Sequence, residues 1–451
     1  MIIGPQEGTL AGTSDPIPNS TNLQRIAELA RHAPNMVIKT LAHHIDDTFL
    51  AEAFRLTRKD GAPGIDGKTA KDFEADLRAN LSDLRERFKS GTYRAPPVRR
   101  VHIPKGKGKT RPIGIPTFED KVLQRAVAMV LNAVYEQDFL DCSYGFRPGR
   151  SAHQALEALW RGIMDMRGGG WVLEVDIKGF FDALDHSHLR SFLDLRVCDG
   201  VIRRTINKWL KAGILEEGKW YKATSGSPQG GVVSPILANV YLHEVLDKWF
   251  TQSVQPRMKG QSFLIRYADD ATLVFSEESD ARRVMDVLGK RLGKFGLEPH
   301  PEKTRLIRFL KPHQAKDPEN GTFDLLGFTH YWGRSRRGKW VVKRKTAKSR
   351  FARGFSAIWS WCSRVRHWRI QDQWKALRRK LSGHFAYYGI THNYAALDRF
   401  RETVLRAWRY WLGRRSQKGY ITWKRFAALQ QRYPLPKARI VHSVLRNMAK
   451  L

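Results

Sequence analysis

The chain has 451 residues, and its 79 Lys and Arg against 44 Asp and Glu give a formal net charge of +35. That excess is larger than solubility requires and indicates a polyanionic partner. The sequence shows no signal peptide and no run of about 18 apolar residues, which argues against a membrane protein and favours a cytoplasmic one. The three cysteines are isolated, so they predict neither a zinc site nor a disulfide framework.

The N-terminal part of the chain is predicted to pass from a disordered leader into a helix. Residues 1–22 form the expected leader. Towards the end of Leu23–Phe54 the apolar residues recur every three or four positions, which predicts one packed face of a helix. The residues of this face are Leu41, Ile45, Phe49, Ala53 and Leu56. Arg58–Ala70 follows and is rich in Gly and Pro, so we interpret it as a loop.

A hairpin and a long helix are predicted next. Val98–Ile103 and Arg111–Ile115 suit the two strands of a hairpin with a Lys- and Gly-rich loop between them. Phe118–Phe139 carries apolar residues at i, i+3, i+4 and i+7, which indicates a helix. We assign this helix to core packing and attach no chemistry to it.

Ser143–Ser151 is a turn that contains Gly, Pro and two arginines. Arg147 and Arg150 suit contacts with a sugar-phosphate backbone better than a role in the fold. The rings of Tyr144 and Phe146 could stack on bases, but we favour burial for both.

Two acidic motifs follow. Trp171–Ile177 is a short apolar run that Asp176 interrupts, and a carboxylate inside such a strand is either paired or bound to a metal. Phe263–Tyr267 and Ala271–Phe275 are predicted strands of a hairpin whose tip carries Asp269–Asp270 in place of the usual Asn-Gly. Adjacent carboxylates in a half-buried turn are costly without a cation, and Mg²⁺ prefers such oxygen ligands. The alternative interpretation is a solvated acidic turn.

These motifs resemble a known family. Asp176–Asp182 (DIKGFFD) and Tyr267–Asp270 (YADD) resemble the two metal-binding motifs of reverse transcriptases. From about Leu56 to the C-terminus, the motifs in their order resemble bacterial group II intron-encoded reverse transcriptases. The resemblance implies an α+β right-hand polymerase, with fingers and palm over residues 23–333 and an all-α thumb/maturase region over 334–451. It also implies two Mg²⁺ ions, held by Asp176, Asp269 and the carbonyl of Ile177, with Asp270 as a further ligand or support.

The resemblance also assigns residues to the incoming nucleotide. Lys109 and Arg111 would contact its triphosphate. Phe181 would lie under the sugar and exclude a 2′-OH, although a core position is the alternative. Gln229, in a Gly-rich loop before a helix that Pro235 opens, would touch the nucleotide. Lys303 would lie near the triphosphate and donate a proton to pyrophosphate, with a solvated lysine as the alternative.

The C-terminal part of the chain is predicted to bind nucleic acid. Phe323–Phe328 resembles the primer-grip segment, where Gly327 would let the primer backbone approach. From Arg334 onward, basic residues alternate with aromatic rings in helix-like segments. We expect most of its tryptophans to form a helical core and its basic faces to follow a phosphate backbone. The basic candidates are Lys343, Arg344, Lys345, Arg414 and Arg415.

The expected function is therefore RNA-directed DNA synthesis together with maturase activity on a group II intron RNA. The expected partners are the intron RNA, an RNA template with a DNA primer, target DNA and dNTPs, in a cytoplasmic ribonucleoprotein of a bacterium. The chain ends without the paired Cys and His of the family's nuclease domain, so no second-strand nicking is expected. Two alternatives remain: a non-catalytic RNA-binding maturase, or a group II-like reverse transcriptase diverted to repair or phage defence.

Overall fold

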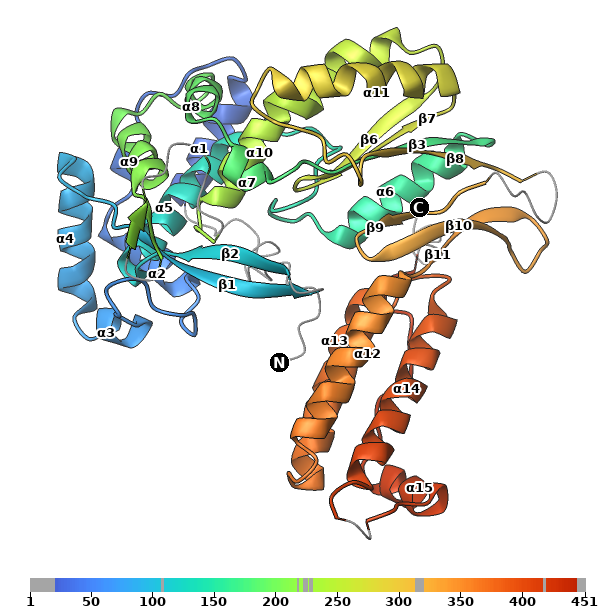
Figure 1. Cartoon of the computed structure of the whole chain (residues 1–451). Coiled ribbons are helices and arrows are strands. Elements are labelled where there is room, and N and C mark those ends of the chain that lie inside the picture. Colours follow the sequence, from blue (N-terminus) through green and yellow to red (C-terminus); the bar gives the residue numbers. More distant parts are fainter. Residues whose placement is uncertain are drawn as a thin grey trace. The chain divides into compact units, whose positions relative to one another are not determined.

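The computed structural model contains both helices and sheets (Figure 1). It divides into two compact units, of which the larger holds the described residues up to Ala155 and Leu173–Leu306. The smaller unit holds Leu156–Val172 and the described residues from Ile307 onward. The structure describes residues 21–106, 109–216, 219–221, 226, 230–312, 320–416 and 419–443.

The N-terminal helix is shorter and more broken than predicted. Helix α1 spans Thr21–His32 and helix α2 spans Asp47–Leu56, with a largely non-helical segment between them. Asp46 caps α2, because its carboxylate accepts a hydrogen bond from the backbone of Phe49 at 2.8 Å. Leu41 is buried as expected, but its backbone N–H donates to Asp199 at 2.7 Å instead of continuing a helix.

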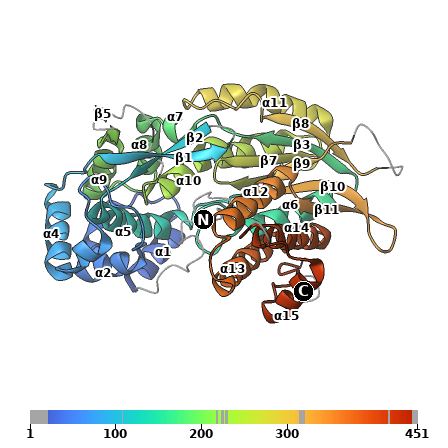
Figure 2. The same cartoon turned by 60° about the horizontal axis from the view of Figure 1, so that its bottom comes forward.

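The predicted hairpin and long helix are confirmed in the larger unit. Strand β1 (Val98–Gly106) pairs antiparallel with β2 (Lys109–Ile115). They belong to a sheet of order β2-β1-β4-β5, completed by β4 (Ile214–Glu216) and β5 (Lys219–Tyr221). Helix α5 (Phe118–Tyr135) is largely buried and contacts both α1 and α2 (Figure 2).

A second sheet, of order β6-β7-β3-β8, carries the acidic motifs. The predicted hairpin is confirmed as β6 (Ser262–Tyr267) and β7 (Asp270–Phe275). Strand β3 (Gly169–Val175) ends one residue before Asp176, so that carboxylate follows the strand instead of interrupting it. Strand β8 spans Arg305–Leu310.

Helix α10 (Ser234–Leu242) has Pro235 in its first turn, as predicted, and continues into π-helical segments. The remaining helices before residue 307 are α3 (Ala70–Glu74), α4 (Leu77–Ser90), α6 (Ala152–Asp165), α7 (Phe180–Ala183), α8 (His186–Asp194), α9 (Gly200–Lys211) and α11 (Glu278–Gly293). None of the described helices has the length and apolar character needed to cross a bilayer.

The smaller unit joins an antiparallel sheet to a group of helices. The sheet has the order β11-β10-β9, with β9 at Phe323–Leu325, β10 at Phe328–Arg334 and β11 at Trp340–Thr346. Because β11 lies beyond residue 334, the expectation of an all-helical region from that residue is wrong. Among the described residues that follow there are four helices: α12 (Lys348–Arg364), α13 (Ile370–Tyr388), α14 (Tyr394–Leu412) and α15 (Trp423–Arg432). Figure 1 shows α12 and α13 running alongside α14.

The tryptophans of this unit are less buried than predicted. Trp361 and Trp408 belong to the helical core, whereas Trp368 and Trp423 are more than half exposed. Arg409 lies over the exposed Trp423 ring, 4.1 Å from its centroid. The Arg409 guanidinium therefore covers part of a tryptophan ring that is not packed in the helical core.

Candidate active site

The structure brings Lys303 to the first acidic motif. The Lys303 ammonium lies 2.5 Å from a carboxylate oxygen of Asp176, with side-chain exposures of 54% and 20%. The backbone around them is also tied together, since His300 N–H donates to the Asp176 carbonyl at 2.7 Å. Ile177 forms a β-bridge with Pro299 directly beside this contact. Lys303 is thus held at Asp176 by its own segment, although the sequence also allowed a solvated lysine.

The second motif is a two-residue turn without glycine. Tyr267 and Asp270 are paired across β6 and β7, which leaves Ala268 and Asp269 as the turn. Ala268 has a φ of +57°, in the left-handed region that non-glycine residues seldom adopt. The Arg266 guanidinium donates to the Ala268 carbonyl at 2.9 Å, which stabilises this conformation. The Asp269 carboxylate is therefore presented by a strained turn with a fixed support.

That support is a buried ion pair. Arg266 donates to the two carboxylate oxygens of Asp247 at 2.7 and 2.6 Å, and both side chains are 0% exposed. The same guanidinium donates to Ser143 Oγ at 2.7 Å and to Asn239 Oδ1 at 3.0 Å. Burial opposes the charge of Arg266, but Asp247 outweighs it and raises the pKa of the guanidinium above its ordinary value.

A second backbone segment lies against the turn. A Cβ added at Gly145 would overlap the backbone nitrogen of Ala268. The Gly145 carbonyl accepts from the Asn239 amide at 2.8 Å, and Tyr144 N–H donates to the Arg266 carbonyl at 2.9 Å. The segment around Gly145 is therefore part of the structure that holds the acidic turn.

The prediction that Arg147 contacts nucleic acid is wrong. Its side chain is 3% exposed and pairs with Glu136 at 3.1 Å. It also donates to the carbonyls of Leu140 and Ser143 at 2.7 and 2.8 Å, so every face of the guanidinium has a partner within the fold. Arg150 is only partly buried and pairs with Asp141 at 2.5 Å.

Two neighbouring phenylalanines divide between core and surface. Phe180 is buried at the start of α7, whereas Phe181 is partly exposed. Arg111 lies on β2 opposite Ile103 and is also partly exposed. Lys109 is the first residue of β2, and its side chain lies outside the described part of the structure, as does Gln229.

Two glycines of the loop that carries Gln229, Gly226 and Gly230, lie against these elements. Gly226 N–H donates to the Leu184 carbonyl at 2.8 Å, and an added Cβ would lie 2.9 Å from the Phe181 carbonyl. A Cβ at Gly230 would lie 2.9 Å from Ile113 Cγ2 of β2. The loop is therefore attached at one end beside Phe181 and at the other to the strand that carries Arg111.

The acidic residues offer the oxygen ligands that a divalent metal ion requires. Asp176 follows β3 and Asp270 opens β7, and these strands are neighbours in one sheet. Within the described residues no three His, Cys, Asp or Glu side chains converge on a point as a complete metal cage. Mg²⁺ is often held by only one or two carboxylates, with substrate phosphates and water completing its shell. The donor set of Asp176, Asp269, Asp270 and the Ile177 carbonyl fits that arrangement.

The three basic candidates on β11 differ in exposure, because side chains alternate between the two faces of a strand. Lys343 and Lys345 point away from the core of β11, and Lys345 lies over the Tyr331 ring. Arg344 between them is 2% exposed, and burial lowers its pKa to about 10, so its predicted contact with nucleic acid is wrong. Gly327 has a φ of +82°, and an added Cβ would lie 3.1 Å from the Tyr388 hydroxyl.

The two candidates at the end of α14 also differ. Arg414 is exposed and lies over the Tyr410 ring. Arg415 donates at 2.5 Å to the carbonyls of both Arg366 and Trp368, so it connects α14 to the segment after α12. Arg414 is therefore better placed than Arg415 to contact a binding partner such as a nucleic acid.

The residues that hold the site together, Arg266 and Asp247, were not predicted from the sequence. Arg266 interrupts the apolar run before YADD, and a charged residue in a buried strand requires a partner. That signal could have directed attention to Asp247, but no spacing rule connects Arg266 to Ser143, which lies 123 residues earlier.

Comparison with known proteins agrees with the motifs. Residues 103–330 match the family described as "Reverse transcriptase (RNA-dependent DNA polymerase)". The chain is 34% identical over 371 residues to protein YkfC of Escherichia coli K12. This match covers 74% of the chain and 93% of that protein. It is 40% identical over 240 residues to the group II intron-encoded protein LtrA of Lactococcus lactis subsp. cremoris, covering 52% of this chain and 39% of that protein.

A more distant relative is nuclear intron maturase 2, mitochondrial, of Arabidopsis thaliana, with 28% identity over 175 residues. That match covers 31% of this chain and 24% of the plant protein, so the chain spans under half the length of two of these three relatives. The family match covers both acidic motifs, the glycine loop and Lys303. The chain belongs to the reverse transcriptases, the RNA-directed DNA polymerases, and proteins encoded by group II introns are among its relatives.

Proposed function

We propose that Asp176 and the Asp269–Asp270 turn form the catalytic centre at which this chain extends a DNA primer on an RNA template. The observation that carries the proposal is the turn itself: a strained, glycine-free tip that a buried arginine supports. Strain of this kind persists where the surroundings enforce it and is concentrated at functional sites. We further propose the right-hand architecture, with fingers and palm before the helices of a thumb/maturase region.

The residues have separate parts in this mechanism. Asp176, Asp269 and the Ile177 carbonyl would hold two Mg²⁺ ions, with Asp270 as a further ligand or support. When bound, the ions would activate the primer 3′-OH and neutralise the charge on the triphosphate and the leaving pyrophosphate. Lys303 is more than half exposed, so its ammonium is free to turn from Asp176 towards the leaving phosphate and donate a proton there.

The remaining residues would select and orient the nucleotide. Lys109 and Arg111 would contact the triphosphate, and Gln229 would lie against the nucleotide on the glycine loop. The partly exposed Phe181 ring would occupy the space that a ribose 2′-OH needs. The product would therefore be DNA.

The direct test is primer extension on an RNA template with dNTPs and Mg²⁺. Asp269→Asn is expected to lower kcat by more than about a hundredfold, because it removes a metal-binding carboxylate. Asp286→Asn, an exposed aspartate of α11, is the matched control and is expected to retain activity. If the wild type does not extend primers while it binds structured RNA tightly, the chain is a non-catalytic RNA-binding maturase.

Phe181→Ala tests the selection of the sugar. The variant is expected to incorporate rNTPs about a hundredfold better relative to dNTPs, since the clash with the 2′-OH is removed. Incorporation of dNTPs by the same variant is the internal control for folding and chemistry. An unchanged preference for dNTPs would exclude Phe181 as the selecting residue.

A maturase role is the second part of the proposal. One relative is described as intron-encoded and another as an intron maturase, which supports intron RNA as a partner beside the template–primer and target DNA. We place this function in a cytoplasmic ribonucleoprotein. The outward-facing Lys343 and Lys345 and the exposed Arg414 would contact phosphates, with Arg150 doing so on the larger unit. Gly327 would lie beside the primer backbone, and the supporting contact of Arg415 would hold Arg414 in place.

The phosphate contacts predict a salt dependence. Lys343→Ala/Lys345→Ala should weaken RNA binding and reduce the slope of log K against log salt by about 1.5, since each neutralised phosphate contributes about 0.7–0.9. Lys290→Ala/Lys294→Ala removes the same charge from the exposed face of α11 and serves as control. Equal slopes for both double variants would show that RNA binding depends on the net charge of the protein and not on the positions of Lys343 and Lys345.

A further inference from the structure

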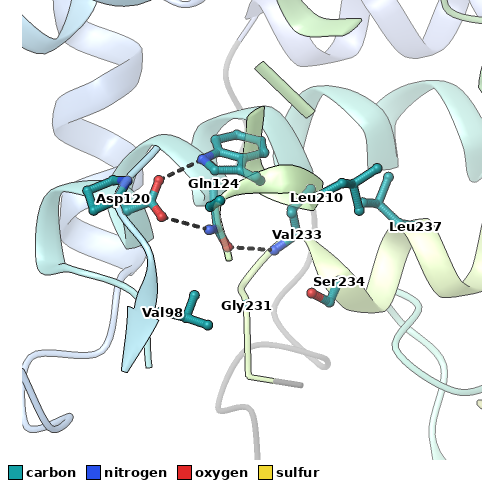
Figure 3. Close-up of a pocket in the computed structure, with 11 residues that line it drawn as sticks. Val98, Asp120, Gln124, Leu210, Gly231, Val233, Ser234 and Leu237 are labelled. Carbon is teal, nitrogen blue, oxygen red and sulfur yellow. Dashed lines mark hydrogen bonds between the residues drawn. The ribbon is translucent and has the colours of Figure 1, made fainter. Parts of the chain in front are cut away.

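The chain just after the glycine loop is held by a buried glutamine of α5. Gln124 Oε1 accepts hydrogen bonds from the backbone N–H groups of Val232 and Val233 at 2.7 and 3.4 Å. Gln124 is almost completely buried, so its carbonyl oxygen is available to these amides and not to bulk water. Figure 3 shows the Gln124 side chain between the backbone at Val233 and the carboxylate of Asp120.

Asp120 determines which way the Gln124 amide points. Its carboxylate is buried and accepts from Gln124 Nε2 at 3.2 Å, from Trp209 Nε1 at 2.6 Å and from the Tyr93 hydroxyl. An ionised carboxylate can only accept hydrogen bonds, so the glutamine must turn its NH₂ towards Asp120. The carbonyl oxygen of Gln124 must then face the loop.

This cluster is not a ligand site of its own. The cavity beside it measures about 10 Å³, which is room for at most about one water molecule. A carboxylate buried among neutral donors is also a poor choice for stability alone, because apolar residues could fill the same space without desolvating a charge. Apolar residues, however, could not accept hydrogen bonds from the backbone N–H groups of Val232 and Val233.

We propose that Gln124, oriented by Asp120, is a positioning residue for the incoming nucleotide. It holds the chain at Val232–Val233, which begins two residues after Gly230, and so adds a third attachment to a loop already held beside Phe181 and β2. The three attachments place the described ends of the loop, Gly226 and Gly230–Val233, beside Phe181 and the strand that carries Arg111. This inference rests on the proposed polymerase function.

The first experiment replaces Gln124 by Met, which keeps the length of the side chain and removes the acceptor. KM for dNTP, measured at saturating template–primer, is expected to rise about tenfold, as the loss of one or two hydrogen bonds predicts. The value of kcat is expected to change less than about twofold, because the contact affects binding and not the chemical step.

Gln373→Met is the matched control. Gln373 is equally buried in α13, donates to the backbone of Val365 at 2.9 Å and accepts from Trp408 Nε1 at 2.9 Å. Its replacement is expected to lower the melting temperature without changing KM for dNTP. If Gln124→Met behaves in the same way, with an unchanged KM, the cluster is purely structural and the proposal is wrong.

A rescue variant makes the test independent of folding. Asp120→Asn alone lets the Gln124 amide turn round and is expected to raise KM for dNTP. In Asp120→Asn/Gln124→Glu the carboxylate moves to position 124, where it can accept from both Val232 N–H and the asparagine amide, and KM is expected to recover. A double variant no better than Asp120→Asn would overturn the proposal. Failure of the wild type to extend primers would instead overturn the polymerase function on which the inference rests.

Discussion

Two buried aspartates of the larger unit hold two different segments of the site, and they are stabilised in different ways. Asp247 pairs with a cation, since Arg266 donates to both of its oxygens. Asp120 is surrounded by neutral donors, namely Tyr93, Trp209 and Gln124. Burial therefore raises the pKa of Asp120 to about 6, while the pairing raises the pKa of Arg266 and keeps its charge.

The difference follows the demands of the two segments. The turn at Ala268 is strained and presents a catalytic carboxylate, so it needs a donor that keeps its charge at every working pH. The loop at Val232 needs only an acceptor of fixed orientation, which a neutral amide supplies. The arginine of the ion pair keeps its charge, because its pKa is raised, whereas a carboxylate among neutral donors leaves a group that titrates near neutrality.

The largest effect is expected from breaking the ion pair. Asp247→Asn leaves the Arg266 charge buried without its counter-charge and should lower the free energy of unfolding by about 3–5 kcal/mol. Denaturant titration would measure this loss. A change of less than about 1 kcal/mol would mean that the arginine does not depend on Asp247.

A compensated variant separates stability from positioning. Asp247→Leu/Arg266→Met replaces both charges by apolar side chains and is expected to recover most of the stability. It leaves the Ala268 carbonyl without its donor, so primer extension should stay impaired. Recovery of both stability and full activity would show that Arg266 does not position the turn.

The second effect is a pH dependence of stability that Asp120 causes. Its folded-state pKa of about 6 lies above the ordinary value of 3.8, so the folded protein binds the proton more tightly than the unfolded chain does. The resulting stability is fully present below about pH 4 and is lost as pH rises through 6, a change of roughly 3 kcal/mol. Unfolding of the wild type should show this loss relative to Asp120→Asn, which has no proton to release there. A constant difference between the two proteins from pH 4 to 7 would contradict the raised pKa.

A third experiment displaces the catalytic turn directly. Gly145→Ala places a methyl group against the Ala268 backbone, which cannot move aside without shifting Asp269. We expect kcat for primer extension to fall about tenfold, or roughly 1.4 kcal/mol in the barrier. Gly260→Ala is the control: it lies next to β6 at the other end of the hairpin, and the three atoms nearest to its added methyl group belong to the side chains of Ser276 and Glu277. Equal effects of the two variants would indicate general damage to the hairpin.

The smallest effect is expected from Tyr93→Phe. The change removes one of the donors to Asp120 and leaves Trp209 and Gln124 in place, so it should cost about 1 kcal/mol of stability. Because the lost hydrogen bond favours the ionised carboxylate, the pKa of Asp120 should rise further. The pH at which stability declines would then move upward in the same unfolding experiment, and an unmoved midpoint would exclude Tyr93 as a partner of the carboxylate.

Local patterns in the sequence were enough for the elements next to the site. The strands on both sides of Asp269 and the helix from Phe118 formed as predicted, because the strands are short runs of β-forming apolar residues and the helix has a strong period of its own. Asp176 was recognisable as a carboxylate near the end of an apolar run, and Asp269 as one of two adjacent carboxylates at the tip of a hairpin. The helix predicted around Leu41 failed for the opposite reason: Asp199, far along the chain, takes the amide that a helix would use.

The amino-acid sequence by itself thus determined the family, the acidic motifs and the elements that carry them. Only the tertiary structure decided which charged residues face a partner and which are used inside the protein. Arg147 and Arg344 resemble surface arginines in the sequence, yet both are buried, because their burial depends on segments far away or on which face of a strand meets the core. Gln124 and Asp120 lie one turn apart in an apolar helix, and their importance becomes visible only when Val232, 108 residues later, comes to lie against them.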